Sequence, residues 1–273
     1  MTGLRGIPFY KMSGSGNDFV VVDVRETGDP ELEDPAAIQR ICARGTGVGA
    51  DGIVLLAPES GVDFRMIYYN ADGTRASMCG NAALCCTRLF AELSGAGGHP
   101  IVFETDSGRI SARLRDGEPE IDLAPVDTVR PELELRPRSG EHRLGFALAG
   151  VPHVTALVPD VEQTDVLGRG RAIRTARELM PAGANANFVS GRRGDWRIRT
   201  YERGVEGETL ACGTGAVASA ILIESWGLDA SPIRLRTRSG RQLTVTLKRQ
   251  GSRWLPSLAG EGRIVFRGEL GEV

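Results

Sequence analysis

Hydrophobic and polar residues follow a pattern along the first half of the chain that predicts strands interrupted by two helices. Pro35 is predicted to open a helix that continues to Arg44, because proline is favoured in the first turn of a helix. A longer helix follows Cys79, where alanine and leucine dominate up to Gly95. Three short strands then lead to about Leu123. Runs rich in β-branched and aromatic residues predict earlier strands at 19–24, 52–57 and 63–69.

The second half repeats this order of strands and helices. Strands are predicted at GFALAG and HVTALV, and again at NFVS and WRIRTYE. Between these pairs, a helix is predicted from Ala172 to Met180, where Pro181 stops it. A further helix, GTGAVASAILIESWG, follows Cys212. Each half therefore has a long helix directly after a cysteine.

Residue identities also repeat at a fixed spacing. The segment HPIVFETDSGRISARL, after the first long helix, resembles SPIRLRTRSGRQLTVTL, after the second. Cys79 and Cys212 are 133 residues apart. Ordinary turn and strand-edge residues can coincide by chance, but one offset shared by several residue types favours an internal duplication. Three matched pairs are each 132 residues apart: Pro100 and Pro232, Thr105 and Thr237, and Arg109 and Arg241.

A duplication of this kind predicts an α/β (α+β) fold. We expect two lobes related by a pseudo-twofold axis, each with a mixed or antiparallel curved sheet around a central helix. An active site is expected in the cleft between the lobes. The N-terminal lobe is predicted to span residues 1–126, and the last strand, 263–273, could return to complete its sheet. The C-terminal lobe is predicted to span residues 127–262.

Charge and hydropathy narrow the function classes. The chain has 33 basic and 35 acidic residues and a formal net charge of −2, so no positive field attracts nucleic acid or anionic lipid. The start of the chain lacks the apolar run of a signal peptide, and no later stretch approaches the ~18 to 20 apolar residues that span a membrane. We therefore expect a cytoplasmic protein whose partners are small molecules or a second copy of itself.

Cysteine, histidine and lysine content bears on cofactors. Five cysteines form an odd set, which argues against a disulfide framework and predicts reduced thiols. His99, His142 and His153 show no ligand spacing with the cysteines, so no metal is expected. Lys11 and Lys248 are the only lysines, which leaves few candidates for the Schiff base of a pyridoxal phosphate enzyme. We expect an enzyme without a cofactor.

Two cysteines precede small-residue turns that open helices. A thiol at a helix N-terminus lies near unpaired N–H groups and the positive end of the dipole, which can lower its pKa from ~8.5 to as low as ~3.5 to 7.5. Glycine lets a carboxylate approach the backbone closely, and the next N–H group can bind it. The two turns are Cys79-Gly80-Asn81 and Cys212-Gly213-Thr214. A small buried thiol is the simpler interpretation for Cys42, Cys85 and Cys86.

Two facing thiols match the needs of stereochemical inversion. Proton exchange at a stereocentre requires a base on one face and an acid on the other. One thiolate and one thiol supply both, and they swap roles with the direction of the reaction. The duplicated context makes Cys79 and Cys212 the predicted catalytic pair.

Five motifs resemble those of the diaminopimelate epimerase family, in order and over nearly the full chain. They are KMSGSGNDFVVVD (11–23), YYNADGTRASMCGNAALC (68–85), PHVTALV (152–158), ANANFV (184–189) and RTYERGVEGETLACGTGA (199–216). The last is the most specific. The resemblance implies pyridoxal-phosphate-independent epimerisation of LL-2,6-diaminopimelate to the meso form, in lysine biosynthesis, by a homodimer.

The resemblance also implies roles for residues near the thiols. Arg203 would bind the distal carboxylate of the substrate through its planar fork. His153 and Glu202 would lie near the thiols and help set their protonation. Without the motifs, a surface ion pair would be an equally good interpretation of Glu202 and Arg203, and a structural imidazole an equally good one of His153. Polar substrate ligands would be Asn17, Asn70 and Asn187, although Asn70 in NADG also fits a turn.

Some positions depart from the commonest pattern of the family. Gly52 replaces a frequent glutamine, and Val151 replaces an asparagine that often contacts substrate. Ala82 and Leu84 also differ. A two-thiol racemase of another amino acid, such as histidine, stays open for this reason, although Arg203 favours a second carboxylate. A thiol redox protein is the alternative from another class, but neither catalytic cysteine belongs to a Cys-x-x-Cys pair.

Overall fold

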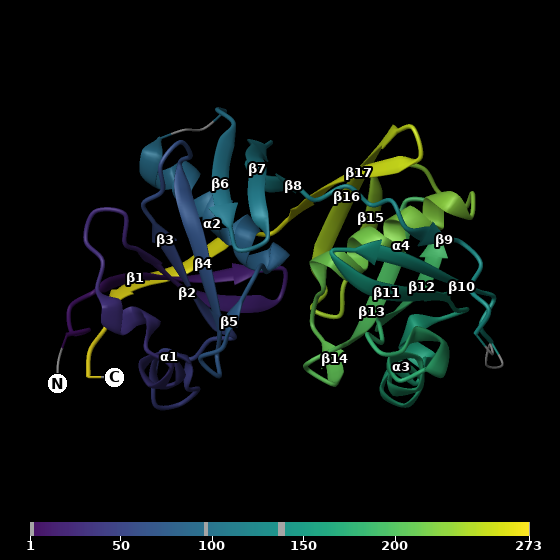
Figure 1. Cartoon of the computed structure of the whole chain (residues 1–273), viewed down its shortest axis with the longest axis horizontal. Coiled ribbons are helices and arrows are strands. Elements are labelled where there is room, and N and C mark those ends of the chain that lie inside the picture. Colours follow the sequence, from purple (N-terminus) through teal and green to yellow (C-terminus); the bar gives the residue numbers. More distant parts are fainter. Residues whose placement is uncertain (1–2, 96–97, 136–139, 273) are drawn as a thin grey trace. The chain divides into compact units, whose positions relative to one another are not determined.

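The computed structural model describes residues 3–95, 98–135 and 140–272 in two compact units (Figure 1). The N-terminal unit comprises Met1–Ile121 and Gly260–Val273, and the C-terminal unit comprises Asp122–Ala259. Among the described residues, no helix combines the length and the apolar character that crossing a bilayer would require.

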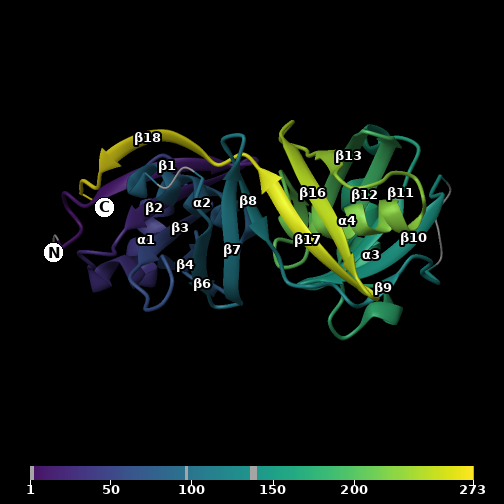
Figure 2. The same ribbon diagram turned by 90° about the horizontal axis from the view of Figure 1, so that it is seen from above.

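The N-terminal unit contains a mixed sheet and two α-helices. Its elements are β1 (Pro8–Gly14), β2 (Asn17–Asp23), a 3-10 helix (Pro30–Glu33), α1 (Pro35–Cys42), β3 (Gly52–Ala57), β4 (Phe64–Asn70), β5 (Arg75–Ala76), α2 (Gly80–Ser94), β6 (Ile101–Thr105), β7 (Gly108–Arg115), β8 (Glu118–Asp122) and β18 (Arg263–Glu269). β1 is antiparallel to β2 and β18, β2 is parallel to β3, and β3 is antiparallel to β4. Figure 2 shows β18, near the end of the chain, alongside β1.

Alternation along the strands gives this sheet two apolar faces. Val20, Val22 and Ile53 pack on one face with Ile38 and Ile41 of α1. The intervening residues of β2 point to the opposite face, and α2 contacts β1, β2, β4 and β7. Most residues of α2 are buried, which explains why small and apolar side chains occur on most sides of this helix.

The C-terminal unit repeats this arrangement. Its elements are β9 (Val129–Arg130), β10 (Arg143–Ala149), β11 (Val151–Leu157), a 3-10 helix (Val161–Gln163), α3 (Val166–Arg174), a second 3-10 helix (Arg177–Leu179), β12 (Asn185–Arg192), β13 (Asp195–Glu202), β14 (Gly207–Thr209), α4 (Gly213–Ser225), β15 (Ile233–Arg236), β16 (Gln242–Gln250) and β17 (Arg253–Gly260). Strands β10 and β11 are antiparallel, β11 and β12 are parallel, and β12 and β13 are antiparallel.

Two faces again follow from strand alternation. Val154, Phe188 and Tyr201 pack with Val166 of α3 and its neighbours. The residues between them point toward α4, as the 3.2 Å contact between Thr155 Oγ1 and an α4 serine hydroxyl shows. This alternation places every second residue of β11 and β12 on the side of the sheet that α4 covers.

The two units correspond residue by residue in their central strands. β2 and β11 have the same order of buried and partly buried positions, which matches Phe19 to His153. The parallel registers agree, because Phe19 pairs with Gly52 and His153 pairs with Asn185. The predicted duplicated α/β fold is confirmed.

The predicted starting residues of the α-helices are confirmed for all but one helix. α1, α2 and α4 begin where the sequence indicated. The helix expected from Ala172 to Met180 instead begins at Val166, because Asp165 Oδ1 caps it by accepting from the N–H of Gly168 at 2.8 Å. It ends at Arg174. Two glycines in VLGRGRAIR weaken the helix signal there, which explains the error.

Candidate active site

Both predicted catalytic cysteines lie at the N-terminus of the central helix of their unit. Cys79 precedes α2 with φ/ψ of −134°/119°, and Cys212 precedes α4 with −132°/111°. Neither side chain makes a capping hydrogen bond. Each cysteine carbonyl accepts the first helical bond, at 2.9 Å, from Ala83 or Ala216. The earlier N–H groups have no acceptor within their helix; they belong to Gly80, Asn81 and Ala82 in α2 and to Gly213, Thr214 and Gly215 in α4.

The sulfur of Cys212 lies near an acid and a hydroxyl group. Sγ is 3.8 Å from Glu202 Oε1, to which the thiol can donate, and 3.6 Å from Thr214 Oγ1. Burial raises the pKa of Glu202 above its ordinary 4.5, against opposing hydrogen bonds. Glu202 is therefore a stronger proton acceptor than an exposed carboxylate, which suits it to exchange a proton with a thiol.

His153 is fully buried on the α4 side of the sheet. Its Nε2 lies 3.0 Å from Thr214 Oγ1, and its Nδ1 lies 3.3 Å from Asn187 Nδ2. Burial, together with the positive charge of Arg203, lowers the pKa of His153 to about 3. The imidazole is therefore neutral near pH 7.

Two asparagines of β12 face the same side, because they are two residues apart on a strand. Asn187 Oδ1 accepts from the Thr200 hydroxyl at 3.0 Å, and its Nδ2 donates to the Val154 carbonyl at 3.1 Å. Asn185 Oδ1 accepts from the backbone N–H of Arg203 at 2.7 Å. Both amides thus have fixed orientations.

The guanidinium of Arg203 is partly exposed beside this network. Its Nη1 donates to the carbonyl of Ala182 at 3.0 Å, which anchors one edge of the fork. A guanidinium carries five donors in a plane, so the opposite edge retains the geometry that binds a carboxylate at two points.

A chain of amides reaches the Cys79 turn in the N-terminal unit. Asn81 Nδ2 donates to Asn17 Oδ1 at 2.7 Å, and Asn17 Nδ2 donates to Asp51 Oδ2 at 3.0 Å. Arg44 donates to the other Asp51 oxygen at 2.8 Å. Asn81 Oδ1 is buried without a hydrogen-bond partner among the described residues. Such an acceptor costs about 1 to 3 kcal/mol, so a donor on a ligand would be stabilised there.

Asn70 serves its own turn. Its Nδ2 donates to Thr74 Oγ1 at 3.0 Å, and its backbone bonds to Thr74 and Gly73 close the NADGT loop. The contacts of Asn70 are therefore those of a residue that closes a turn. Its role as a substrate ligand stays a prediction.

Asp51 and Asn185 were not anticipated as parts of these networks. Asp51 ends the loop before β3, where its carboxylate also accepts from the N–H of Asp18 at 3.2 Å. Only the fold brings this loop beside β2. Asn185 could have been found, because its alternation with Asn187 in ANAN places both on one face of a strand.

The departure at Gly52 has a steric cause. A Cβ atom at this position would come within 2.4 Å of the Tyr69 carbonyl oxygen and 2.6 Å of Tyr68 Cε2. The ring of Tyr68 fills the space that a side chain at residue 52 would need. Ala82 and Leu84 lie in the buried part of α2.

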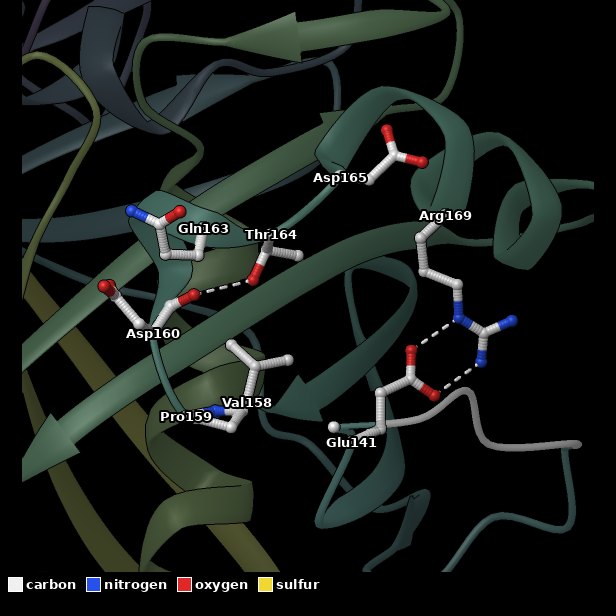
Figure 3. A pocket seen from close by; sticks show the side chains of 9 residues that line it. Glu141, Val158, Pro159, Asp160, Gln163, Thr164, Asp165 and Arg169 are labelled. Carbon is white, nitrogen blue, oxygen red and sulfur yellow. Dashed lines mark hydrogen bonds and ion pairs between the residues drawn. The ribbon is translucent and has the colours of Figure 1, made fainter.

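A separate pocket of about 400 Å³ lies in the C-terminal unit (Figure 3). Arg169 and Glu141 form a bidentate ion pair at one side of it, with Nε to Oε1 at 2.5 Å and Nη2 to Oε2 at 2.8 Å. The backbone carbonyl of Asp160 accepts from Thr164 Oγ1 on another side. None of the predicted site residues lines this pocket.

Solved structures share the fold of this chain. A phenazine biosynthesis protein of the PhzF family from Bacillus anthracis matches with a TM-score of 0.70 at 14% identity, covering 97% of this chain and 99% of that one. A hydroxyproline epimerase from Agrobacterium vitis, solved with trans-4-hydroxy-L-proline bound, matches with a TM-score of 0.65 at 20% identity, covering 99% and 94%. The chain shares its fold with both of these proteins.

Sequence comparison identifies the family. The sequence profile of diaminopimelate epimerase matches residues 9–129 and 146–265. A diaminopimelate epimerase of Gemmatimonas aurantiaca is 48% identical, with 96% of this chain and 98% of that protein covered. The enzyme of Aquifex aeolicus is 40% identical, with 97% and 98% covered. The chain belongs to the diaminopimelate epimerase family, whose members are isomerases.

Proposed function

We propose that this protein interconverts LL- and meso-diaminopimelate through the thiols of Cys79 and Cys212. The single observation that carries this proposal is the matched pair of cysteine turns, because two helices of a duplicated fold begin with a cysteine in the same backbone conformation. Membership of the family supports the substrate and its place in lysine biosynthesis.

In this mechanism one thiolate removes the α-proton from one face of the substrate. The second thiol donates a proton to the other face, which inverts the stereocentre. Glu202 can accept the Cys212 proton across their 3.8 Å contact, so this thiol can enter the cycle as a thiolate. No cofactor is required, because each sulfur alternates between acid and base.

Substrate contacts follow from the same groups. The first N–H groups of α2 and α4, at Gly80, Asn81, Gly213 and Thr214, would hold the α-carboxylate and stabilise the negative charge that develops there. Arg203 would bind the distal carboxylate. Asn17, Asn70 and Asn187 remain proposed polar ligands, with Asn187 the most constrained of them by its present bonds.

A cytoplasmic homodimer is the proposed working state. β18 is an outer strand whose Val265 and Phe266 side chains are 45% and 48% exposed, an unusual apolar pair for a strand surface. If two copies pair antiparallel about Phe266, Arg263 of one copy faces Glu269 of the other. This charge complementarity supports a second copy of the chain as the partner.

Proton exchange with solvent tests the substrate. Reduced protein without added cofactor is incubated with LL-diaminopimelate in deuterated water, and the α-proton is followed by NMR, with L-histidine in a parallel sample. Meso product with deuterium at the inverted carbon supports the proposal. Exchange on histidine and none on diaminopimelate would keep the chemistry and reject the substrate.

A further inference from the structure

We infer that Arg174 is a positioning residue: its ion pair with Glu206 holds this carboxylate away from Arg203 and keeps the Arg203 guanidinium open to a second carboxylate on the substrate. The inference rests on the proposed function in taking Arg203 as the group that binds the distal carboxylate. It assigns a task to the last residue of α3, which lies outside all of the sequence motifs.

Arg203 and Glu206 are the first and last residues of the four-residue loop between β13 and β14. Glu202 and Gly207 pair directly before and after this loop, and the N–H of Glu206 donates to the Glu202 carbonyl at 2.8 Å. The two ends of a short hairpin loop lie beside each other. A guanidinium and a carboxylate therefore start from neighbouring backbone positions, within reach of each other.

Glu206 would compete with the substrate if its carboxylate turned to Arg203. Its side chain is 48% exposed, and its pKa lies below the ordinary 4.5, chiefly because the N–H of Gly204 donates to it and also because Arg174 is close. The carboxylate is therefore ionised near neutral pH. An ion pair with Arg203 would occupy the edge of the guanidinium that a substrate carboxylate needs.

The Glu206 carboxylate points to α3 instead. Its Oε1 accepts from Arg174 Nε at 3.1 Å and from the Gly204 N–H at 3.2 Å. Its Oε2 accepts from the Tyr201 hydroxyl at 3.3 Å. In the described part of the chain Arg203 enters no ion pair, although this acid lies in the same loop.

Of the three donors to Glu206, Arg174 alone is charged. A hydrogen bond from a charged donor is roughly twice as strong as a neutral one. The two neutral bonds, from Gly204 at 3.2 Å and Tyr201 at 3.3 Å, are also at or beyond the long end of the usual range. Without Arg174, the stronger interaction available to Glu206 is with the Arg203 guanidinium. The ion pair to α3 therefore decides where this carboxylate points.

Close packing of α3 fixes Arg174 beside the loop. This helix contacts both β13 and β14 (Figure 1). Gly170, one turn before Arg174 on the same face, lies directly against Tyr201 and leaves no room for a Cβ atom. The Arg174 side chain is 20% exposed, so its position is constrained on most sides.

The N-terminal unit lacks this arrangement. The strand register makes Asn70 the counterpart of Glu202, so the corresponding loop begins with Ala71 in place of Arg203. The N–H of Asn70 donates to the Thr74 carbonyl, which closes that loop one residue earlier than the loop that contains Glu206. The guanidinium and its charged neighbours are therefore features of one unit, as expected if a second carboxylate is bound on one side only.

Steady-state kinetics with LL-diaminopimelate separates binding from chemistry. We expect Arg174→Met to raise KM about tenfold and to change kcat less than about twofold, because Glu206 then occupies Arg203 in the free enzyme. The double variant Arg174→Met/Glu206→Gln should return KM to within about twofold of the wild type, because glutamine carries no charge. Arg174→Lys keeps a positive charge beside Glu206, so its KM should stay within about threefold.

Arg171→Met is the matched control for the loss of a positive charge. It removes an exposed arginine from the same helix and should change KM less than about twofold. A wild-type KM in Arg174→Met, a tenfold rise in Arg174→Lys, or a double variant no better than Arg174→Met would overturn the inference.

A crystal structure of Arg174→Met tests the same inference without turnover. We expect the Glu206 carboxylate to lie within about 4 Å of the Arg203 guanidinium. A carboxylate that stays on the Gly204 N–H and the Tyr201 hydroxyl would contradict the inference. A wild type that does not convert LL-diaminopimelate would reject the proposed substrate, and the position of Glu206 in this variant would still decide the role of Arg174.

Discussion

Gly215 lies so close to Asn187 that a Cβ atom there would come within 2.5 Å of the asparagine Oδ1. It would also lie 3.3 Å from the Cβ and Sγ atoms of Cys212. The third residue of α4 is therefore glycine because Asn187 of β12 and the side chain of Cys212 both approach the helix at this point. Its counterpart in α2 is Ala82, where the facing strand carries no such amide.

Replacement of Gly215 by alanine should therefore disturb the site as well as the fold. We expect Gly215→Ala to lower the free energy of unfolding by about 1 to 3 kcal/mol, because the methyl group displaces the Asn187 amide. Urea denaturation measures this loss. The control is Gly28→Ala, whose Cβ would meet no atom closer than the Val24 carbonyl oxygen at 4.0 Å. Equal effects of the two substitutions would show that the contact is unimportant.

Burial of Glu202 predicts a pH dependence of stability. Because its folded-state pKa is raised above 4.5, this carboxyl contributes stability that is fully present below pH 4.5 and is lost as pH rises through its folded pKa. Glu202→Gln has no such charge to bury. We expect the variant to gain stability relative to the wild type between pH 4.5 and 7.5, measured by urea denaturation. A difference that does not change with pH would contradict the raised pKa.

Asp51 should matter to catalysis although it is not itself a predicted substrate ligand, because it holds Asn17. Asp51→Ala removes the acceptor that orients Asn17, and through it the Asn81 side chain. We expect kcat/KM to fall about 10- to 100-fold, the range for a lost hydrogen bond to a charged group. The matched control is Asp106→Ala, which breaks exposed ion pairs with Arg65 and Arg75 and should change kcat/KM less than about twofold.

The proposed dimer makes a prediction about size in solution. Phe266→Asp places a charge in the middle of β18, where a second copy would bury it, so we expect sedimentation to show a monomer. Leu167→Asp replaces another exposed apolar residue, on α3, and should leave the dimer intact. A wild-type monomer, or a dimer in Phe266→Asp, would argue against this strand as the interface.

Much of the fold could be predicted because its signals are local. The starts of α2 and α4 are marked by a cysteine and a small-residue turn, and the offset between TDSGR and TRSGR indicated two copies of one unit. α3 was misplaced because its cap, Asp165, precedes a glycine-containing segment of weak helix propensity.

The contacts inside the site depend on packing that a motif does not encode. Nothing in the sequence indicates that His153 bonds to Thr214, 61 positions later, or that Asp51 holds Asn17 from a loop 34 positions away. Packing of α4 on β11 makes the first contact, and the parallel register of β2 and β3 makes the second. The motifs named residues of the predicted site, and strand pairing together with helix packing decided which of them touch.

The source of the proton delivered to the product tests the two-thiol account most directly. LL-diaminopimelate is incubated in deuterated water with the wild type, Cys79→Ala or Cys212→Ala, and the reaction is stopped when only a small fraction of the substrate has been converted. Deuterium is then measured separately in the product and in the recovered substrate. The account predicts deuterium at the inverted carbon of the product, protium in the recovered substrate, and no meso product from either variant. Product that retains the original α-proton, or undiminished turnover in one cysteine variant, would contradict it.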